Sequence, residues 1–215
     1  EKNLFPELEY IFKHALIQEV AYSTLLVARK KEFHEKIGKA TEEIYTERLE
    51  EFYEMLAYHY SKSDNFEKAI HYLRLCGIRA SANYSNWEAF DFYKEALDTL
   101  SCLPETKENK KAQIEVLLEI FGPMQLLGFP EESFEILKEG KRLSKELGDE
   151  RSHSIFYSHI SSYYNLKGDP FKGREYAEYG FNEARKIQDI ELLVPLANSL
   201  CDSYHITGDF LKITI

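Results

Sequence analysis

The chain has 215 residues, of which 44% are hydrophobic and 30% are charged, a balance typical of a folded domain with a real core. Its formal net charge of −10 argues against a nucleic-acid partner, because phosphate binding needs a surplus of Lys and Arg on one face. No apolar run approaches the length of a membrane span, which argues against a membrane segment.

The N-terminal stretch EKNLFPELEY lacks the basic and apolar character of a secretory leader. It also does not look like a natural start, so we expect a fragment of a longer chain. Three widely spaced cysteines, Cys76, Cys102 and Cys201, suit reduced thiols better than a disulfide framework. We therefore expect a cytoplasmic protein. The only strand-like alternation lies around Tyr10 to Lys13.

From about residue 50 onward, apolar residues recur with a helical period. The expected helices come in facing pairs, with a less regular pair between Ala80 and Leu100, where Ser85 and Asn86 can cap a helix. Pro123 lies inside an expected helix and should kink it. The apolar stripes of the regular pairs are Phe52–Leu56–Tyr60 with Ala69–Leu73–Cys76, Ile114–Leu117–Phe121 with Phe134–Leu137–Leu143, and Ile160–Tyr164 with Phe171–Tyr176–Phe181, before a last stripe at Leu192–Leu196–Leu200.

The segment YYNLKGDPFKGREY raises the question of whether Gly168-Asp169-Pro170 is a ligand loop or an elbow between helices. The pattern recurs along the chain. Tyr164, with Gly168 four residues later and Gly173 nine later, has counterparts 40 positions away on either side, and a fourth copy begins at Tyr60; these copies are Met124–Gly128–Ser133, Tyr204–Gly208–Ile213 and Tyr60–Asp64–Ala69. Gly ends a helix in the left-handed conformation, Asp caps the next helix, and Pro fits its first turn. A nucleotide loop occurs once in a domain, so the repetition favours an elbow.

Each helix pair leaves an apolar stripe that only a neighbouring pair can cover. The prediction is therefore an all-α protein, built of helix-turn-helix repeats stacked in a right-handed superhelix. Residues 48–215 form the repeats, with the last one truncated, and residues 1–47 form a separate N-terminal part.

The repeats resemble the tetratricopeptide repeat (TPR). The resemblance is carried by Leu56-Ala57, Tyr60, Ala69, Leu73 and Cys76, by Trp87, Ala89, Tyr93 and Ala96, and by Ile160-Ser161, Tyr164, Gly173, Ala177 and Gly180. The step of about 40 residues is longer than the usual 34. It is similar to the helical repeats of large bacterial signalling ATPases.

Residues 10–45 resemble a segment that follows the ATPase core in STAND- and AAA-type regulators. There the segment is the tail of a winged-helix-like subdomain, and its closest version occurs in bacterial proteins with a class III adenylate or guanylate cyclase domain. No GxxxxGK[ST] motif or cyclase signature is present, so the resemblance implies a parent's activity that this chain would not perform. The matching residues are Phe12, His14-Ala15-Leu16, Glu19, Ala21-Tyr22, Leu25-Leu26, Arg29-Lys30-Lys31 and Phe33-His34.

Candidate catalytic or metal-binding residues are few. His14 and His34 are expected to orient or cap helices, and His153 and His159 lack a ligand spacing. Cys201 and His205 share a helix face, but no further His or Cys pair accompanies them, so repeat packing explains them better than a metal does. We therefore expect no catalytic residue, no cofactor and no metal.

In TPR arrays the first helix of each pair lines a groove, and its inward polar residues are candidates for partner binding. Ordinary exposed polar positions are the simpler interpretation of the same residues. The candidates are Glu54, Tyr58, Gln125, Ser158, Ser162, Asn165, Asn198, Asp202 and His205.

The sequence thus predicts a non-catalytic interaction or regulatory module of a multidomain signalling ATPase or nucleotide cyclase. Its partner would be a protein or peptide, or another domain of the same chain, without nucleic acid or membrane. The alternative is a helical-repeat domain that senses a small ligand, as in transcriptional activators of the STAND type.

Overall fold

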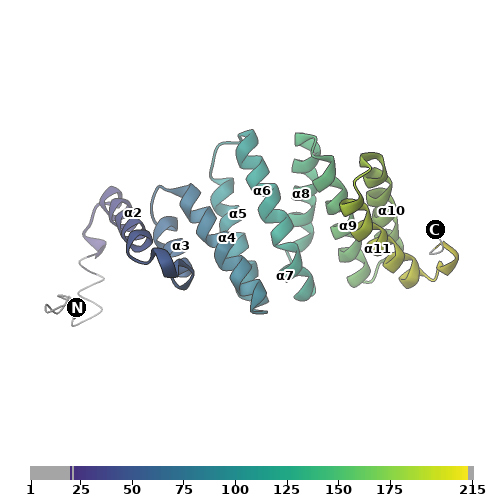
Figure 1. Cartoon of the computed structure of the whole chain (residues 1–215), viewed down its shortest axis with the longest axis horizontal. Helices are drawn as coiled ribbons and strands as arrows, with labels where there is room; N and C mark the ends of the chain where they lie inside the picture. Colours follow the sequence, from purple (N-terminus) through teal and green to yellow (C-terminus); the bar gives the residue numbers. More distant parts are fainter. Residues whose placement is uncertain (1–19, 21, 213–215) are drawn as a thin grey trace.

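A computed structural model describes residue 20 and residues 22–212, and all regular structure in that part of the chain is helical (Figure 1). This confirms the all-α prediction; the expected alternation around Tyr10 to Lys13 lies outside the described residues. The helices stand side by side in an elongated row, with α2 at one end of it and α10 and α11 at the other. In chain order they are α2 (Val27–Ile44), the 3-10 segment η1 (Thr46–Phe52), α3 (Tyr53–Ser61), α4 (Phe66–Ala82), α5 (Asn86–Ser101), α6 (Lys107–Glu119), α7 (Phe121–Leu126), α8 (Ser133–Leu147), α9 (Glu150–Leu166), α10 (Pro170–Ile187), α11 (Ile190–Thr207) and η2 (Phe210–Lys212).

The helices form two layers, because each packs against its neighbours in sequence while alternate helices share polar and ring contacts. The first layer contains α2, α4, α6 with α7, α9 and α11. Lys68 of α4 pairs with Glu42 of α2, and Arg74 of α4 pairs with Glu119 of α6. Further along, the rings of Phe121 and His159 stack between α7 and α9, and α9 is hydrogen-bonded to α11.

The second layer contains α3, α5, α8 and α10. Lys94 of α5 pairs with Glu132 at the start of α8. Lys141 of α8 lies over the ring of Tyr176 on α10. The array is therefore a two-layered solenoid in which the chain crosses from one layer to the other at nearly every turn.

The repeated glycines are elbows. Gly128, Gly168 and Gly208 follow helices α7, α9 and α11, with φ of 73°, 89° and 78°, a region that glycine enters without a Cβ penalty. Asp169 then caps α10 by accepting a hydrogen bond from the Lys172 amide (3.2 Å), and Pro170 is the first residue of that helix. The Asp64 copy differs, because the left-handed residue is missing there and Asn65 caps α4.

The turns between consecutive units, after α8 and after α10, have a similar construction. Gly148 and Gln188 adopt left-handed conformations at the ends of α8 and α10. Asp149 caps α9 through the Ser152 amide (3.0 Å), and Asp189 caps α11 through the Glu191 amide (3.0 Å). Each carboxylate satisfies an amide that the first helical turn leaves without a partner.

Close contact between consecutive helices depends on small residues. Gly38 of α2 and Gly77 of α4 leave room for the rings of Tyr60 and Tyr93 on the next helix, since a Cβ at either glycine would lie 2.7 Å from the ring. Gly140 of α8 leaves room for Phe156 of α9 in the same way. The predicted small positions Ala69, Ser133 and Gly173 are likewise buried.

The expected helix pair between Ala80 and Leu100 is wrong. Helix α4 continues unbroken to Ala82, and one helix, α5, follows it. The stripe Ala69–Leu73–Cys76–Ala80 stays buried along α4, so no break in packing interrupts that helix. A sharp connection follows, in which Tyr84 has a φ of 60° and Ser85 precedes α5 without a side-chain cap.

The kink at Pro123 is confirmed. Helix α6 ends at Glu119 and α7 begins at Phe121, with the fully buried Ile120 between them. Proline lacks the amide that would bond to the Glu119 carbonyl and its ring crowds that carbonyl, so the helix breaks one turn before it. The next amide, that of Met124, bonds to the Ile120 carbonyl (3.1 Å).

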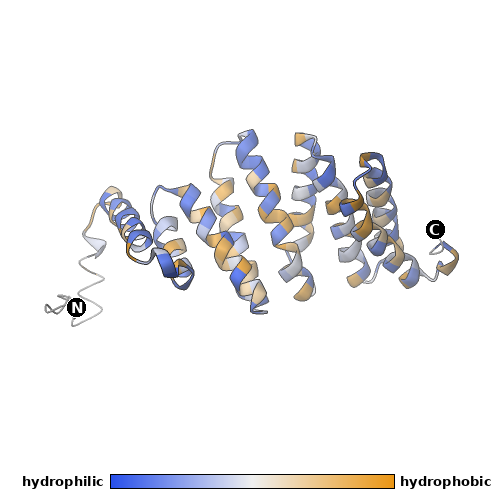
Figure 2. Ribbon diagram, in the orientation of Figure 1, coloured by the Kyte–Doolittle hydropathy of each residue, from blue (hydrophilic) through white to orange (hydrophobic). Residues whose placement is uncertain are grey.

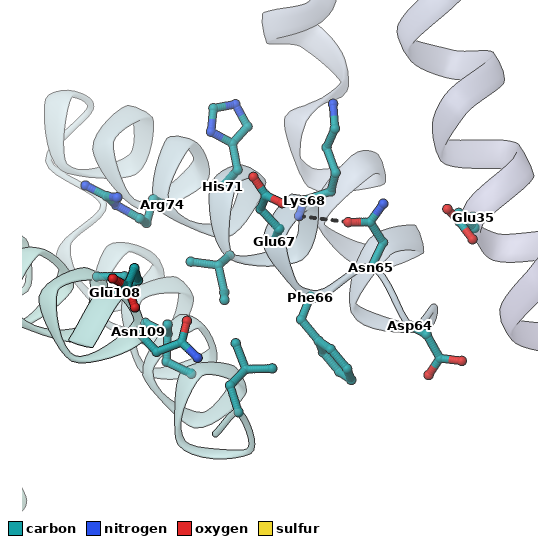
Figure 3. A pocket seen from close by; sticks show the side chains of 14 residues that line it. Glu35, Asp64, Asn65, Phe66, Glu67, Lys68, His71, Arg74, Glu108 and Asn109 are labelled. Atoms are coloured by element: carbon teal, nitrogen blue, oxygen red, sulfur yellow. Dashed lines mark hydrogen bonds between the residues drawn. The ribbon is translucent and has the colours of Figure 1, made fainter. Parts of the chain in front are cut away.

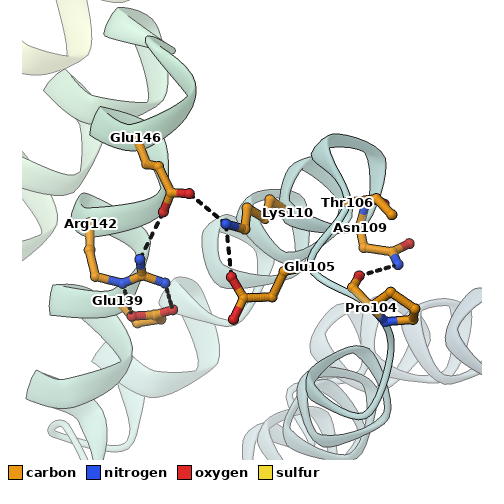
Figure 4. Close-up of polar contacts among 8 residues, drawn as sticks. All are labelled: Pro104, Glu105, Thr106, Asn109, Lys110, Glu139, Arg142 and Glu146. Carbon is orange, nitrogen blue, oxygen red and sulfur yellow. Dashed lines mark hydrogen bonds and ion pairs between the residues drawn. The ribbon is translucent and has the colours of Figure 1, made fainter.

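Polar contacts reinforce the joint between α6 and α8. Lys110 pairs with Glu105 (2.9 Å) and Glu146 (2.5 Å), while Arg142 pairs with Glu139 and Glu146 (Figure 4). Elsewhere every helix alternates hydrophilic and hydrophobic positions along its length, as expected for helices with one buried side (Figure 2). Several buried positions of the C-terminal half hold serine instead of a large apolar residue: Ser133, Ser144, Ser152, Ser154, Ser161 and Ser203.

We predict that Gly140→Ala destabilises the protein by about 1–3 kcal/mol, the usual cost of overpacking. The new Cβ would lie 2.2 Å from Cε1 of Phe156, whose ring is fully buried and cannot move aside. Urea denaturation followed by circular dichroism measures the difference in unfolding free energy.

Gly122→Ala is the matched control, since no atom lies within 4 Å of a Cβ at this helical glycine. We expect it to leave stability unchanged or raise it by up to about 1 kcal/mol, because alanine restricts the unfolded chain. Equal effects of the two substitutions would show that α8 and α9 do not approach as closely as described.

Candidate partner-binding surface

Most of the predicted groove residues lie on the first layer. Gln125 is exposed on α7, and Ser158 and Ser162 are half-buried on α9. Asn198 and Asp202 are exposed on α11. The structure therefore places these five side chains on consecutive first-layer helices.

Asn165 belongs to the joint between α9, α10 and α11. Its Nδ2 donates to Ser203 Oγ on α11 (3.1 Å), and its Oδ1 is buried without a hydrogen-bond partner. A Cβ at Gly173 of α10 would lie 2.0 Å from that oxygen. The side chain thus contributes to packing between three helices. His205, by contrast, is exposed, and its ring meets Phe210 edge-on at 5.5 Å.

Glu54 and Tyr58 lie on α3, in the second layer, and the structure does not bring them together with the other candidates. Glu54 pairs with Arg79 of α4. The exposed ring of Tyr58 meets the ring of His34 at a centroid distance of 5.7 Å. Both residues therefore take part in contacts between α3 and the first-layer helices on either side of it.

A cavity of about 990 Å³ opens on the first layer between α4 and α6, a feature that the sequence did not indicate. Its floor is apolar, and Glu35 of α2 lies at one edge. Figure 3 shows Lys68, His71 and Arg74 projecting from α4 along one side of it. The apolar floor residues are Ile70, Leu100, Leu103 and Ala112, and the remaining polar rim residues include Asp64, Glu67, Glu108 and Asn109.

Charges of both signs line this cavity. Arg74 is held by two carboxylates of α6, Glu115 at 2.9 Å and Glu119 at 2.6 Å, and the hydrogen bond to Glu119 raises the pKa of its guanidinium. Burial lowers the pKa of His71, and the charges of Lys68 and Arg74 lower it further, so this ring is neutral near pH 7. A cavity with a rim of mixed charge and an apolar floor suits a bound peptide that has mainly polar side chains and a few apolar ones.

One carboxylate anchors the N-terminal end of the surface. Glu42 of α2 accepts hydrogen bonds from Tyr60 and Tyr72 and pairs with Lys68 (2.7 Å). Burial alone would raise its pKa, but the hydrogen bonds from Lys68, Tyr72 and Tyr60 outweigh this effect and lower the pKa. A charged Glu42 therefore ties α2 to both α3 and α4.

A histidine pair lies where α2 meets α3. The Nδ1 atoms of His34 and His59 are 2.9 Å apart, and His34 Nε2 is 3.0 Å from the Tyr22 hydroxyl. One Nδ1 must donate and the other accept, which requires at least one neutral ring. Burial lowers the pKa of both histidines. Both rings therefore take part in the contact between α2 and α3.

The other histidines and cysteines singled out in the sequence lie in separate environments. His159 stacks on Phe121 with ring centroids 3.5 Å apart, and burial lowers its pKa to about 3. Cys201 and His205 have no third ligand, and no group of three or more His, Cys, Asp and Glu side chains in the described part of the chain is placed to hold a metal. None of the helices within residues 20 and 22–212 is both long and apolar enough to span a bilayer.

No protein-family model matches the sequence, and no curated protein is significantly similar to it. Solved structures with the same architecture do exist. One is the crystal structure of the nearly identical TPR-like repeats of a Podosopora anserina protein described as a kinesin light chain. It matches with a TM-score of 0.59 and 15% identity, over 87% of this chain and 91% of that chain. BtubC (BKLC) from P. vanneervenii has a TM-score of 0.56 and 15% identity, over 88% and 87%. At this identity the likeness shows the fold, a TPR-like helical-repeat solenoid.

We predict that the unfolding free energy decreases as the pH falls from about 7 to about 5. His34 and His59 have lowered pKa values in the folded state, so the unfolded chain binds more protons in this interval. Melting temperatures at pH 7.5, 6.5 and 5.5 measure the trend.

The double variant His34→Gln with His59→Gln should show a smaller decrease over the same interval, because amides do not titrate there. His205→Gln, at an exposed position on α11, is the control and should keep the wild-type trend. An identical pH dependence in all three proteins would remove the histidine pair as its cause.

Proposed function

We propose that the chain is a non-catalytic module that binds a protein or peptide on its first layer. The observation that carries the proposal is the open cavity of about 990 Å³ on that layer, with its apolar floor and mixed-charge rim. The exposed polar side chains of α7 and α11, with the half-buried Ser158 and Ser162 of α9 between them, continue this surface along the array. TPR-like solenoids as a class present extended surfaces of this kind to other proteins.

The wider context that we propose is a cytoplasmic, bacterial signalling protein with an ATPase or a nucleotide cyclase upstream. This rests on the resemblance of residues 10–45. The matching residues Phe12, His14-Ala15-Leu16, Glu19 and Ala21 lie outside the described residues. We propose residues 1–47 as the end of a winged-helix-like subdomain and 48–215 as the repeats; the boundary falls within η1.

The contacts of α2 support a regulatory link between the two parts. Glu42 and His34 of the family-like segment bond to Tyr60, Tyr72 and His59 of the following helices. A partner that moves α4 relative to α6 would therefore act on the helix that leads upstream. If deletion of the repeats leaves ATP turnover by the longer parent protein unchanged, the regulatory part of the proposal fails.

We predict that peptides selected from a random 12-residue display library bind this surface. Glu108→Arg, at the exposed rim of the cavity on α6, should weaken such a peptide at least about tenfold in fluorescence anisotropy, because the new side chain blocks the surface and reverses its charge. Glu175→Arg, exposed on α10 in the second layer, makes the same chemical change elsewhere and should have no effect.

A thermal-shift screen with sugars and nucleotides tests the alternative of a small-ligand sensor. A stabilising sugar or nucleotide, with no peptide enriched, would replace the proposal by that alternative. Peptide binding that Glu108→Arg leaves intact would contradict the location of the site.

A further inference from the structure

The second layer carries a smaller cavity, of about 450 Å³, between α8 and α10. Its lining includes Lys141 and Lys145 of α8, Tyr176 of α10 and, beneath them, the buried Ile160 of α9. This groove lies on the opposite layer from the candidate surface described above. Lysine and arginine predominate among its charged side chains, in a protein whose net charge is −10.

Lys141 is half-buried in this groove between two aromatic rings. Its Nζ lies 4.6 Å from the ring centroid of Tyr157 and 5.2 Å from that of Tyr176. No carboxylate of the described residues lies within ion-pair distance of it. Burial lowers its pKa, and the charge of Lys145 lowers it further, so the ammonium would gain from an added anion.

The neighbouring cations behave differently. Lys138 pairs with Glu135 (3.0 Å), and Arg142 is held by Glu139 and Glu146. Lys145, like Lys141, has no ion-pair partner among the described residues. Two lysine charges on consecutive turns of α8 are therefore uncompensated, while the charges beside them are already satisfied.

From this arrangement we infer that the α8–α10 groove binds a short acidic segment of a partner protein, with Lys141 and Lys145 as its charged contacts and Tyr176 as one of its walls. A carboxylate above the rings can accept from the Lys141 ammonium, and the cation–π contacts hold that ammonium in place. The two lysines are four residues apart and face the same side of α8, so two carboxylates of an extended chain can be bound together.

The overall charge of the protein limits the size of this ligand. A long polyanion, including nucleic acid, would be repelled by the net charge of −10, whereas a few carboxylates in the groove lie mainly within the field of the two lysines. Binding should therefore be weak to moderate and should decrease with added salt. The inference is independent of the first-layer proposal, because the groove opens on the second layer and its charged contacts lie on α8.

The test uses a fluorescein-labelled peptide of eight glutamates, with eight-lysine and Gly-Ser peptides for comparison, in anisotropy titrations at low and moderate salt. We expect the glutamate peptide alone to bind, and Lys141→Gln to weaken it about tenfold or more. Lys141→Arg should retain binding, because it keeps the charge over the rings. Tyr176→Leu should weaken binding, since it removes one wall.

Lys36→Gln on α2 is the matched control, because it removes one lysine charge far from the groove and should leave binding almost unchanged. Circular dichroism melts establish that each variant is folded. The inference is overturned if the glutamate peptide does not bind, if Lys36→Gln weakens it as much as Lys141→Gln does, or if Glu108→Arg on the first layer abolishes it. Loss of library-peptide binding without loss of glutamate-peptide binding would affect only the first-layer proposal.

Discussion

The fold depends on how closely consecutive helices approach, and at several of these contacts a glycine makes the approach possible. Gly38, Gly77 and Gly140 each leave a space that an aromatic ring of the next helix fills. Between α9 and α10 the contact is closer still, since Gly173 and Gly180 face the carbonyls of Ser161 and Ser154. Packing of this density gains dispersion energy and removes apolar area from water, and any added atom must be accommodated by neighbours that cannot move.

Buried serines extend the same constraint into the C-terminal half. Ser144 and Ser154 donate to the carbonyls of Gly140 and Glu150 four residues earlier, so their hydroxyls are satisfied within their own helices. Ser161 and Ser203 meet across α9 and α11 at 3.2 Å. Small polar residues thus replace large apolar ones at these contacts between helices. The outer faces of the two layers differ from each other. The first layer has a mixed-charge cavity and the second a lysine-rich groove.

The local chemistry of the chain was readable from sequence. Elbows at Gly128, Gly168 and Gly208, the aspartate caps and the break before Pro123 follow from residue type and helical period alone. The layer of each helix was not. Tyr164 and Tyr204 are 40 positions apart, the span of two helices, whereas Met124 lies 64 positions after Tyr60, the span of three. If the two steps were equal, Glu54 and Tyr58 would lie in the same layer as the later candidates, as we expected from the sequence. The longer step between Tyr60 and Met124 was the sign in the sequence that they do not.

The cavity beside Arg74 could not be predicted, because it is formed by side chains of α4, α5 and α6 that the repeat pattern does not relate.

Alternation between the layers has a consequence for how such a chain can change its length. α4 packs against α3 before it and against α5 after it, and both of these lie in the other layer. The layer of each helix therefore depends on whether an odd or an even number of helices precedes it. Loss of one helix would turn every later helix over, and the surfaces of the two halves would then face opposite ways. Loss or duplication of two adjoining helices would preserve them. Gene rearrangements that retain a continuous recognition face must therefore proceed in even steps.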